Sequence, residues 1–165
     1  MNGELFRHLK GQTIKVDRGG PHSAVGKCIG YGDDYITLLT KNNGLVVYKL
    51  YHVKSISQSL KEQEQIDTFI PEEVEQQFSG LDFKTMINNN FDHQWVKIIP
   101  ENIEGVLDSV SDDYITLIAN EELIRVSMHH IRSVSNGQFA TQEESEETDS
   151  NAKNQQNSRK TNRRK

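Results

Sequence analysis

The sequence predicts a mainly β protein: two tandem small barrels, each with a short leading helix, followed by a disordered tail. Three observations support this fold class. The six residues DDYITL occur twice, at positions 33–38 and 112–117. Both copies are flanked by short segments in which apolar and polar residues alternate, as they do in half-buried strands. Gly, Asn and Asp separate these segments at close, regular spacing, which is typical of an antiparallel barrel or sandwich.

The match between the two copies extends well beyond these six letters. Position 112 follows position 33 by 79 residues, and the glycines at 26 and 105 have the same separation. Further on, the sequence HVKSIS at 52–57 resembles HIRSVS at 130–135, with a separation of 78 residues. Because the register holds on both sides of DDYITL, we infer an internal duplication in which one residue has been lost between the two matches.

Each copy is expected to begin with a short helix. Residues 3–10 place apolar side chains on one face and stop before Gly11, a residue type favoured just after a helix. Residues 82–87 show the same pattern. The apolar positions are Leu5, Phe6 and Leu9 in the first helix and Phe83, Met86 and Ile87 in the second.

Five short strands are expected after each helix, because β-branched and aromatic residues dominate these segments. They lie at 13–16, 26–29, 35–38, 45–48 and 53–56 in the first copy, and at 95–98, 105–108, 114–117, 123–126 and 131–134 in the second. A helix and five strands within about fifty residues resemble the Sm-like or SH3-like small barrel. That likeness concerns topology and carries no activity.

These patterns set the expected domain boundaries. We expect a first β-barrel repeat at 3–57, an acidic linker at 58–80, a second β-barrel repeat at 81–136 and a disordered charged tail at 137–165. A unit of about fifty residues buries only about 60% of its unfolded surface, so the repeats should pack together or oligomerise. The linker has apolar residues at rough helical spacing, which leaves two alternatives: marginal helix lying on a barrel, or a fully solvated segment.

The tail is predicted to be disordered from its composition. Apolar residues nearly vanish after residue 136, an acidic block runs from 143 to 149, and the end from 159 to 165 is basic. Such a segment cannot bury enough apolar area to offset its ordering entropy. Blocks of opposite charge suit electrostatic contacts with other chains or with polyanions.

The lengths of the apolar runs and the cysteine content limit two properties of the protein, membrane insertion and disulfide formation. No run reaches the roughly 18–20 apolar residues that cross a bilayer, and the amino terminus lacks an apolar signal core, so we expect no membrane insertion. Cys28 is the single cysteine and excludes an intramolecular disulfide. It aligns with Leu107, which indicates a small apolar residue on a strand. An intermolecular crosslink is the alternative.

The histidines give no pattern of a metal site. His52 and His130 are equivalent, and His129 precedes His130. Neighbouring residues on a strand point to opposite faces, so such a pair does not chelate a metal. The sequence has neither cysteine pairs at ligand spacing nor a His-Glu-x-x-His motif. We therefore expect turn histidines, no metal and no cofactor.

The paired carboxylates Asp33-Asp34 and Asp112-Asp113 are the candidates for general acid and base chemistry. Both pairs are expected in turns, where aspartate is favoured because it hydrogen-bonds to the backbone. No nucleophile or histidine follows at a suitable spacing, and the alternating ligands of a calcium loop are absent. We expect no enzyme and no catalytic residue. A hydrolase that used these turns would lose activity on Asp34→Asn.

The segment Arg18-Gly-Gly-Pro21 is a candidate anion cradle, because backbone amides of glycine-rich turns bind anions. No helix is expected after it and no Gly-Lys-Ser/Thr is present, so the phosphate-loop interpretation fails. We expect an ordinary hairpin loop.

Nucleic-acid binding is the rival function, since Sm-like barrels often bind RNA. Acidic residues outnumber basic ones by 24 to 19, and the net charge is −5. Six of the basic residues lie in the tail, at 153, 159, 160, 163, 164 and 165. The electrostatic contribution that dominates such binding would therefore oppose it in the folded part.

A family resemblance rests on motifs found in both copies. The first copy contains Arg18-Gly-Gly-Pro21, Gly26, Asp34-Tyr35 and Tyr51-His-Val-Lys-Ser-Ile-Ser57, and the second contains Trp95-Val-Lys-Ile98, Pro100-Glu101, Ile103-Glu-Gly105, Asp113-Tyr114 and His130-Ile-Arg-Ser-Val-Ser135. Together they resemble the repeat of the spore coat protein B family of endospore-forming bacteria. That repeat reads W-V-x-I-x-R-G-G-P-E, then D-D/G-Y, and closes with H-I/V-K-S-I-S. The resemblance covers about residues 5 to 136, and the second copy departs from it by lacking Arg-Gly-Gly.

The resemblance implies a non-enzymatic structural component of the endospore coat, in its outer layer, made in the mother-cell cytoplasm. Its partners would be other coat proteins. Members with a long Ser/Lys/Arg-rich tail are phosphorylated by a coat kinase, but this tail is short and has three serines: Ser145, Ser150 and Ser158. Ser158 precedes Arg159 and is the candidate phosphorylation site. The short tail argues against regulation by that kinase.

We therefore predict a coat building block that assembles through contacts of its tandem β modules. Linked modules make the second contact effectively intramolecular, so weak contacts sum to stable incorporation. Self-association through exposed strand edges would add to this. The alternative is a cytoplasmic Sm-like RNA-binding adaptor.

Overall fold

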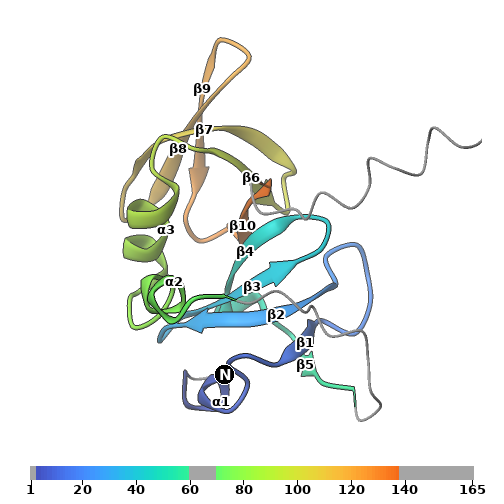
Figure 1. Cartoon of the computed structure of the whole chain (residues 1–165). Coiled ribbons are helices and arrows are strands. Elements are labelled where there is room, and N and C mark those ends of the chain that lie inside the picture. The colour runs from blue at the N-terminus through green and yellow to red at the C-terminus, as the bar shows by residue number, and fades with distance from the viewer. Residues whose placement is uncertain (1–2, 60–69, 138–165) are drawn as a thin grey trace, which may run out of the picture.

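The computed structural model describes residues 3–59 and 70–137, which form a mainly β protein (Figure 1). The mainly β fold class predicted from the sequence is confirmed. The expected disordered tail, Ser158 included, lies outside the described residues except for Gly137, and the linker expected at 58–80 is described only in part. We call residues 3–59 the first half and residues 70–137 the second half.

The first half is a short helix followed by a four-stranded antiparallel meander. Strand β5 then returns to pair with β1 through Lys15 opposite Ser57 and Val16 opposite Ile56. The elements are α1 (Gly3–Arg7), β1 (Thr13–Val16), β2 (Ala24–Tyr31), β3 (Tyr35–Thr40), β4 (Gly44–Lys49), the 3-10 helix η1 (Leu50–His52) and β5 (Ile56–Ser57).

The second half repeats this strand order. Its last strand, β10, pairs with β6 as β5 pairs with β1. The elements are α2 (Glu72–Gln77), α3 (Phe83–Phe91), β6 (Trp95–Ile99), β7 (Ile103–Val110), β8 (Tyr114–Ala119), β9 (Glu122–Ser127) and β10 (Ser133–Asn136).

The two separate barrels expected from the sequence are not confirmed. All ten strands of the described residues belong to one sheet, in the order β5-β1-β2-β3-β4-β10-β6-β7-β8-β9. The reason is strand β10, which is hydrogen-bonded on one side to β6 of its own half and on the other side to β4 of the first half. Figure 1 shows β10 between these two neighbours.

Strand positions agree with the sequence pattern, but several lengths do not. Strand β2 is longer than expected and contains an irregularity between Cys28 and Gly30, and β7 has its own between Leu107 and Ser109. The fifth strand of each half starts later than the alternation predicted. Residues 50–52 form η1, so β5 begins only at Ile56.

The buried residues form two clusters. One cluster fills the concave side of the first half and includes Phe6, Ile14, Ile36 and Leu38. The larger cluster fills the second half and also takes in side chains from the opposite face of the first half, namely Ile29, Tyr35, Leu39, Leu45 and Val47. Strand β3 is consequently buried along its whole length.

Helix α3 is fixed at its first turn by two carboxylates. The Asp82 side chain accepts a hydrogen bond from the backbone N–H of Thr85 at 2.8 Å, as an N-cap residue does. The Asp34 side chain, from the turn between β2 and β3, accepts one from the backbone N–H of Phe83 at 2.8 Å. Asp34 therefore ties the second half to the first.

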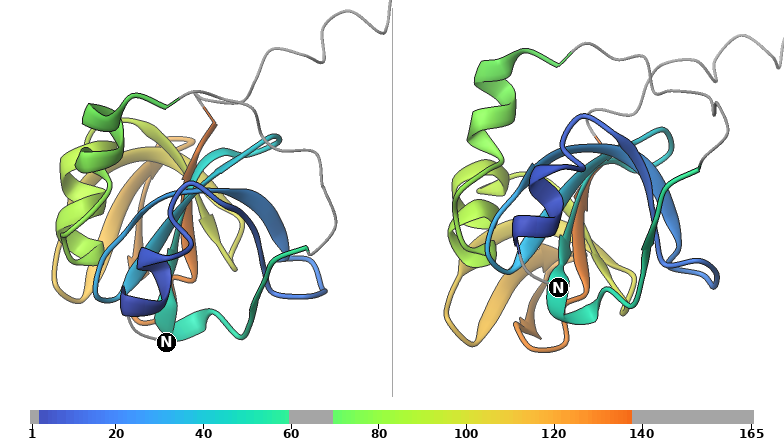
Figure 2. Two further views of the ribbon diagram at one scale, coloured as in Figure 1. Left: turned by 60° about the horizontal axis from the view of Figure 1, so that its bottom comes forward. Right: turned by 90° about the horizontal axis from the view of Figure 1, so that it is seen from below.

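Helix α2 and the residues after it lie against β2. The carbonyl of Phe78 accepts a hydrogen bond from the Tyr35 hydroxyl at 3.2 Å, and a Cβ atom at Gly30 would lie 2.0 Å from the Phe78 carbonyl oxygen. Position 30 therefore admits only glycine at this close approach. Figure 2 shows α2 and α3 beside the strands of both halves.

Burial of Cys28 gives a test of the two interpretations of this thiol. Cys28 is fully buried, and burial raises its pKa to about 12. Because the thiolate is the reactive form, we expect Cys28 in the folded protein to react with Ellman's reagent at pH 8 at least about a hundredfold more slowly than in urea. Rapid reaction of the folded protein, or a reducible dimer on a gel, would instead support the intermolecular crosslink.

Candidate functional site: the seam between the two halves

The hydrogen-bonded pair of strands β4 and β10 joins the second half to the first, and we call this pair the seam. Its register places Tyr48 opposite Ser133, Val47 opposite Val134, Val46 opposite Ser135 and Leu45 opposite Asn136. All eight residues are buried. Two segments about ninety residues apart in the chain thus share one ladder with no exposed edge.

A buried ion pair closes one end of the seam. The guanidinium of Arg132, just before β10, contacts the carboxylate of Asp17, just after β1. Only 11% of the Arg132 side chain and 8% of the Asp17 side chain are exposed. The other carboxylate oxygen positions the backbone near β5, since it accepts hydrogen bonds from the N–H groups of Lys54 at 2.9 Å and Ser55 at 3.2 Å.

Two further contacts cross the seam beside this pair. Lys49 Nζ donates a hydrogen bond to the carbonyl of Met128 at 2.9 Å and lies 5.4 Å from the centre of the Phe83 ring. Burial lowers the pKa of Lys49. His52 Nε2 donates to the carbonyl of His129 at 2.9 Å. Each contact joins a side chain of the first half to the backbone of the second.

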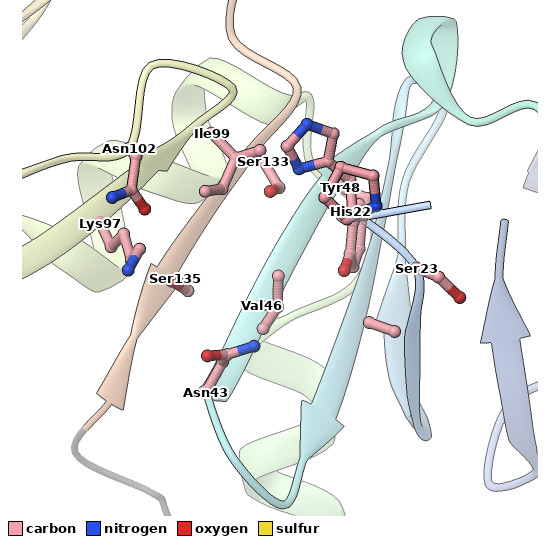
Figure 3. Close-up of a pocket in the computed structure, with 12 residues that line it drawn as sticks. His22, Ser23, Asn43, Val46, Tyr48, Lys97, Ile99, Asn102, Ser133 and Ser135 are labelled. Atoms are coloured by element: carbon pink, nitrogen blue, oxygen red, sulfur yellow. The ribbon is translucent and has the colours of Figure 1, made fainter. Parts of the chain in front are cut away.

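A pocket of about 220 Å³ opens over the seam (Figure 3). It is smaller than the roughly 300–1,000 Å³ of typical small-molecule sites. Its lining comes from the loop between β1 and β2 and from strands β4, β6 and β10: Pro21, His22, Ser23, Ala24, Asn43, Val46, Tyr48, Lys97, Ile99, Asn102, Ser133 and Ser135.

The pocket offers several polar groups. His22, Ser23, Ser133 and Ser135 line it, and the Ser23 hydroxyl donates a hydrogen bond to the carbonyl of Asp17. Burial raises the pKa of Tyr48 to about 12, which keeps its hydroxyl protonated. The Lys97 ammonium pairs with Glu104 at 2.8 Å. The pocket is a small polar recess over the seam.

The paired aspartates lie where turns were predicted, and their contacts are structural. The Asp34 carboxylate holds the start of α3, and its carbonyl accepts a hydrogen bond from the N–H of Leu50. The carbonyl of Asp113 accepts the matching bond from Met128. Asp112 pairs with Lys84. Asp34 and Asp112 thus contact neighbouring residues, Phe83 and Lys84, at the start of α3.

The histidines that the sequence singled out lie in turns at one end of the seam. His129 and His130 occupy the turn before β10, as expected from the sequence, with ring centres 5.6 Å apart. The His52 ring centre lies 6.4 Å from that of His129. Within residues 3–59 and 70–137, no group of three or more His, Cys, Asp and Glu side chains is placed to hold a metal ion.

The Arg18-Gly-Gly-Pro21 segment forms the loop between β1 and β2, as predicted. Its backbone follows a left-handed conformation at Asp17 and at Gly20, with φ of 52° and 94°. The Ser23 hydroxyl donates to the carbonyl of Asp17 at 2.6 Å and closes the loop. Pro21 reaches the rim of the seam pocket.

Sequence reasoning missed Asp17 and Arg132 as the residues that join the halves. Asp17 was read as the first residue of a loop, and Arg132 as part of a closing motif. A signal existed in the comparison of the two copies. Asp17 has no acidic counterpart, since β6 ends with Ile99 at the matching position, and such a difference marks a contact that only one copy makes.

Comparison with curated proteins gives a relative for most of the chain. The chain is 33% identical over 141 residues to spore coat protein B of Bacillus subtilis (strain 168), a match that covers 81% of this chain and 34% of the relative. The chain belongs to a spore coat protein B-like family. It spans about a third of the length of this relative. No protein-family model matches the chain, and no solved structure matches it.

None of the helices in the described residues is long and apolar enough to cross a membrane.

The buried ion pair of the seam makes a stability prediction. Asp17→Asn keeps a side chain that tolerates the left-handed backbone but leaves the Arg132 charge buried without its partner. Breaking such a pair costs about 3 kcal/mol, and we expect this loss in the free energy of unfolding measured by urea titration. The matched control is Asp33→Asn at an exposed turn position, which should change stability by less than about 0.5 kcal/mol. Equal stability of both variants would show that the pair does not hold the seam.

Proposed function

We propose that this protein is a non-enzymatic structural component of the bacterial endospore coat. The observation that supports the proposal is the 33% identity to spore coat protein B over 81% of the chain. The Asp34 carboxylate binds the backbone N–H of Phe83 and Asp112 pairs with Lys84, contacts that support a structural role for these aspartates.

The proposed mechanism of assembly is multivalent contact through tandem β modules. In this proposal, residues 3–57 and 81–136 are two copies of one small-barrel module, joined by the acidic segment 58–80 and followed by the charged tail 137–165. Supporting this, the pairing order β5-β1-β2-β3-β4 recurs as β10-β6-β7-β8-β9. Because two modules are linked, the second contact with a neighbour is effectively intramolecular, and weak contacts sum to stable incorporation.

The proposed partners are other coat proteins, and the proposed location is the outer coat layer after synthesis in the mother-cell cytoplasm. Ser158 remains the candidate phosphorylation site.

Localisation in sporulating cells tests the proposal. We expect a fluorescent fusion to form a ring around the forespore, while the free fluorescent protein expressed from the same promoter stays diffuse. The readout is fluorescence microscopy through a sporulation time course. Diffuse fluorescence of the fusion in growing and sporulating cells alike would discard the coat function.

The rival RNA-binding function makes a separate prediction. The excess of acidic residues opposes binding to a polyanion, so we expect the chain without residues 138–165 to give no shift of a labelled single-stranded RNA in 50 mM salt. The full chain is the comparison, since any weak binding should come from its basic end. Saturable binding by the shortened chain that falls steeply between about 50 and 200 mM salt would favour the rival.

A further inference from the structure

Within residues 3–59 and 70–137, the sheet ends in two strands that each lack a neighbouring strand on one side. Strand β9 pairs with β8 at one end, and β5 pairs with β1 at the other. Figure 1 shows these strands at opposite ends of the molecule. By position in the duplicated sequence, β9 corresponds to β4 and β5 corresponds to β10. The two free edges are therefore the counterparts of the two edges that meet in the seam.

The face beside the free edge of β9 carries three exposed apolar side chains together with the exposed Arg125, which pairs with Thr116 between them. Tyr114, Ile118 and Leu123 are 38%, 45% and 53% exposed. Their counterparts in the first half are Tyr35, Leu39 and Leu45, which are 0%, 8% and 2% exposed. The same positions are thus covered in one half and bare in the other, and exposed apolar patches of this kind mark sites of protein contact.

The cover over the first-half face is the second half itself. Tyr35, Leu39 and Leu45 belong to the buried cluster that also contains Phe83 and Ile87 of helix α3 and Val134 of β10. Helix α3 precedes the second meander as α1 precedes the first.

Helix α1 offers a matching apolar side chain. Gly11 after α1 and His93 after α3 both have a positive φ, and they donate matching backbone hydrogen bonds to Cys28 and Leu107. Counting back from these positions, Leu5 on α1 corresponds to Ile87 on α3. Ile87 is fully buried, whereas Leu5 is 46% exposed.

We propose that a second copy of this chain docks its first half on the β8–β9 face, with its β5 added to the free edge of β9. The contact reproduces the seam between chains. The seam register then fixes the new pairing: Ser55 of one copy lies opposite Val126 of the other, Ile56 opposite Arg125, Ser57 opposite Ile124 and Gln58 opposite Leu123. Strand β10 is paired on both sides and has four residues, whereas β5 is paired on one side and has two. The free side of β5 thus accounts for its shorter length.

The contact is head to tail, so each added copy brings a new free β9. Such heterologous association continues until a ring closes or a filament extends. It is weaker than the seam, because Lys54 and Ile99 stand where the seam has Arg132 and Asp17, and Ser127 stands where it has Lys49. The ion pair and the lysine contact are therefore missing. A second copy of the chain would be one of the coat protein partners of the proposed function, and the biological role of this contact rests on that function.

The first experiment measures self-association of the purified full chain by sedimentation velocity over a concentration series. We expect reversible, concentration-dependent oligomers. Leu123→Lys removes an apolar contact on the receiving face and Leu5→Lys one on the docking face, and each should lower the association constant by about tenfold or more. Val25→Lys is the matched control, because Val25 is 47% exposed on β2, a strand with neighbours on both sides that β1 separates from β5.

Mixing the two variants gives the decisive test of direction. Leu123→Lys keeps an intact docking face and Leu5→Lys keeps an intact receiving face, so the mixture should form a 1:1 heterodimer and stop there. Circular dichroism confirms that both variants are folded. A wild-type chain that stays monomeric at all concentrations, or a mixture no more associated than its components, overturns the proposal.

Engineered cysteines test the register. Leu123→Cys in one chain and Gln58→Cys in the other should form a disulfide on mixing, since partners on antiparallel strands have Cα atoms about 5 Å apart. Leu123→Cys with Lys54→Cys is the control, four residues out of register. Equal crosslinking of both pairs, or dimers of Leu123→Cys alone, overturns the pairing. Neither result bears on coat localisation, so a failure here is distinguishable from failure of the proposed function.

Discussion

Strand β10 is the constraint on which the rest of the structure depends, because it is hydrogen-bonded to both halves. Its bonds to β6 close the second half, and its bonds to β4 make the sheet continuous. A strand in this position satisfies its backbone groups on both edges, which a fifth strand paired only to its own half cannot do. The burial of β4 and the contact of Arg132 with Asp17 both follow from where β10 lies.

The seam also explains how two units that are small by themselves share one stable core. A domain of about fifty residues buries too little surface to be more than marginally stable. Here the outer face of β3 and β4 is buried against the second half, and Tyr35 and Val47 belong to the second half's cluster. The first half therefore supplies part of the second half's core, and the two should unfold together.

Much of this fold could be predicted from the sequence, because its signals are local. Alternating apolar residues located all ten strands, and Asp82 marked the start of a helix. The seam could not be predicted in the same way, because it joins strands about ninety residues apart. The alternation within each of these strands is equally consistent with an edge strand that is half-buried. One local signal was available. Strand β4 reads Leu-Val-Val-Tyr without interruption, as a strand buried on both faces does, whereas β9 reads Leu-Ile-Arg-Val.

The single exchange of Val47 for Arg125 shows how one arrangement of strands can support both a permanent and a reversible contact. Val47 is fully buried in the seam, and a charge there would be buried without a partner. Arg125 lies on the edge strand β9 with its guanidinium 5.9 Å from the centre of the Tyr114 ring, and a charged side chain on such an edge weakens pairing with other chains. The apolar neighbours Ile118 and Leu123 keep the same face attractive to a partner. Compared with the proposed head-to-tail contact, the internal seam would be the more stable of the two, because it alone has the ion pair of Asp17 with Arg132.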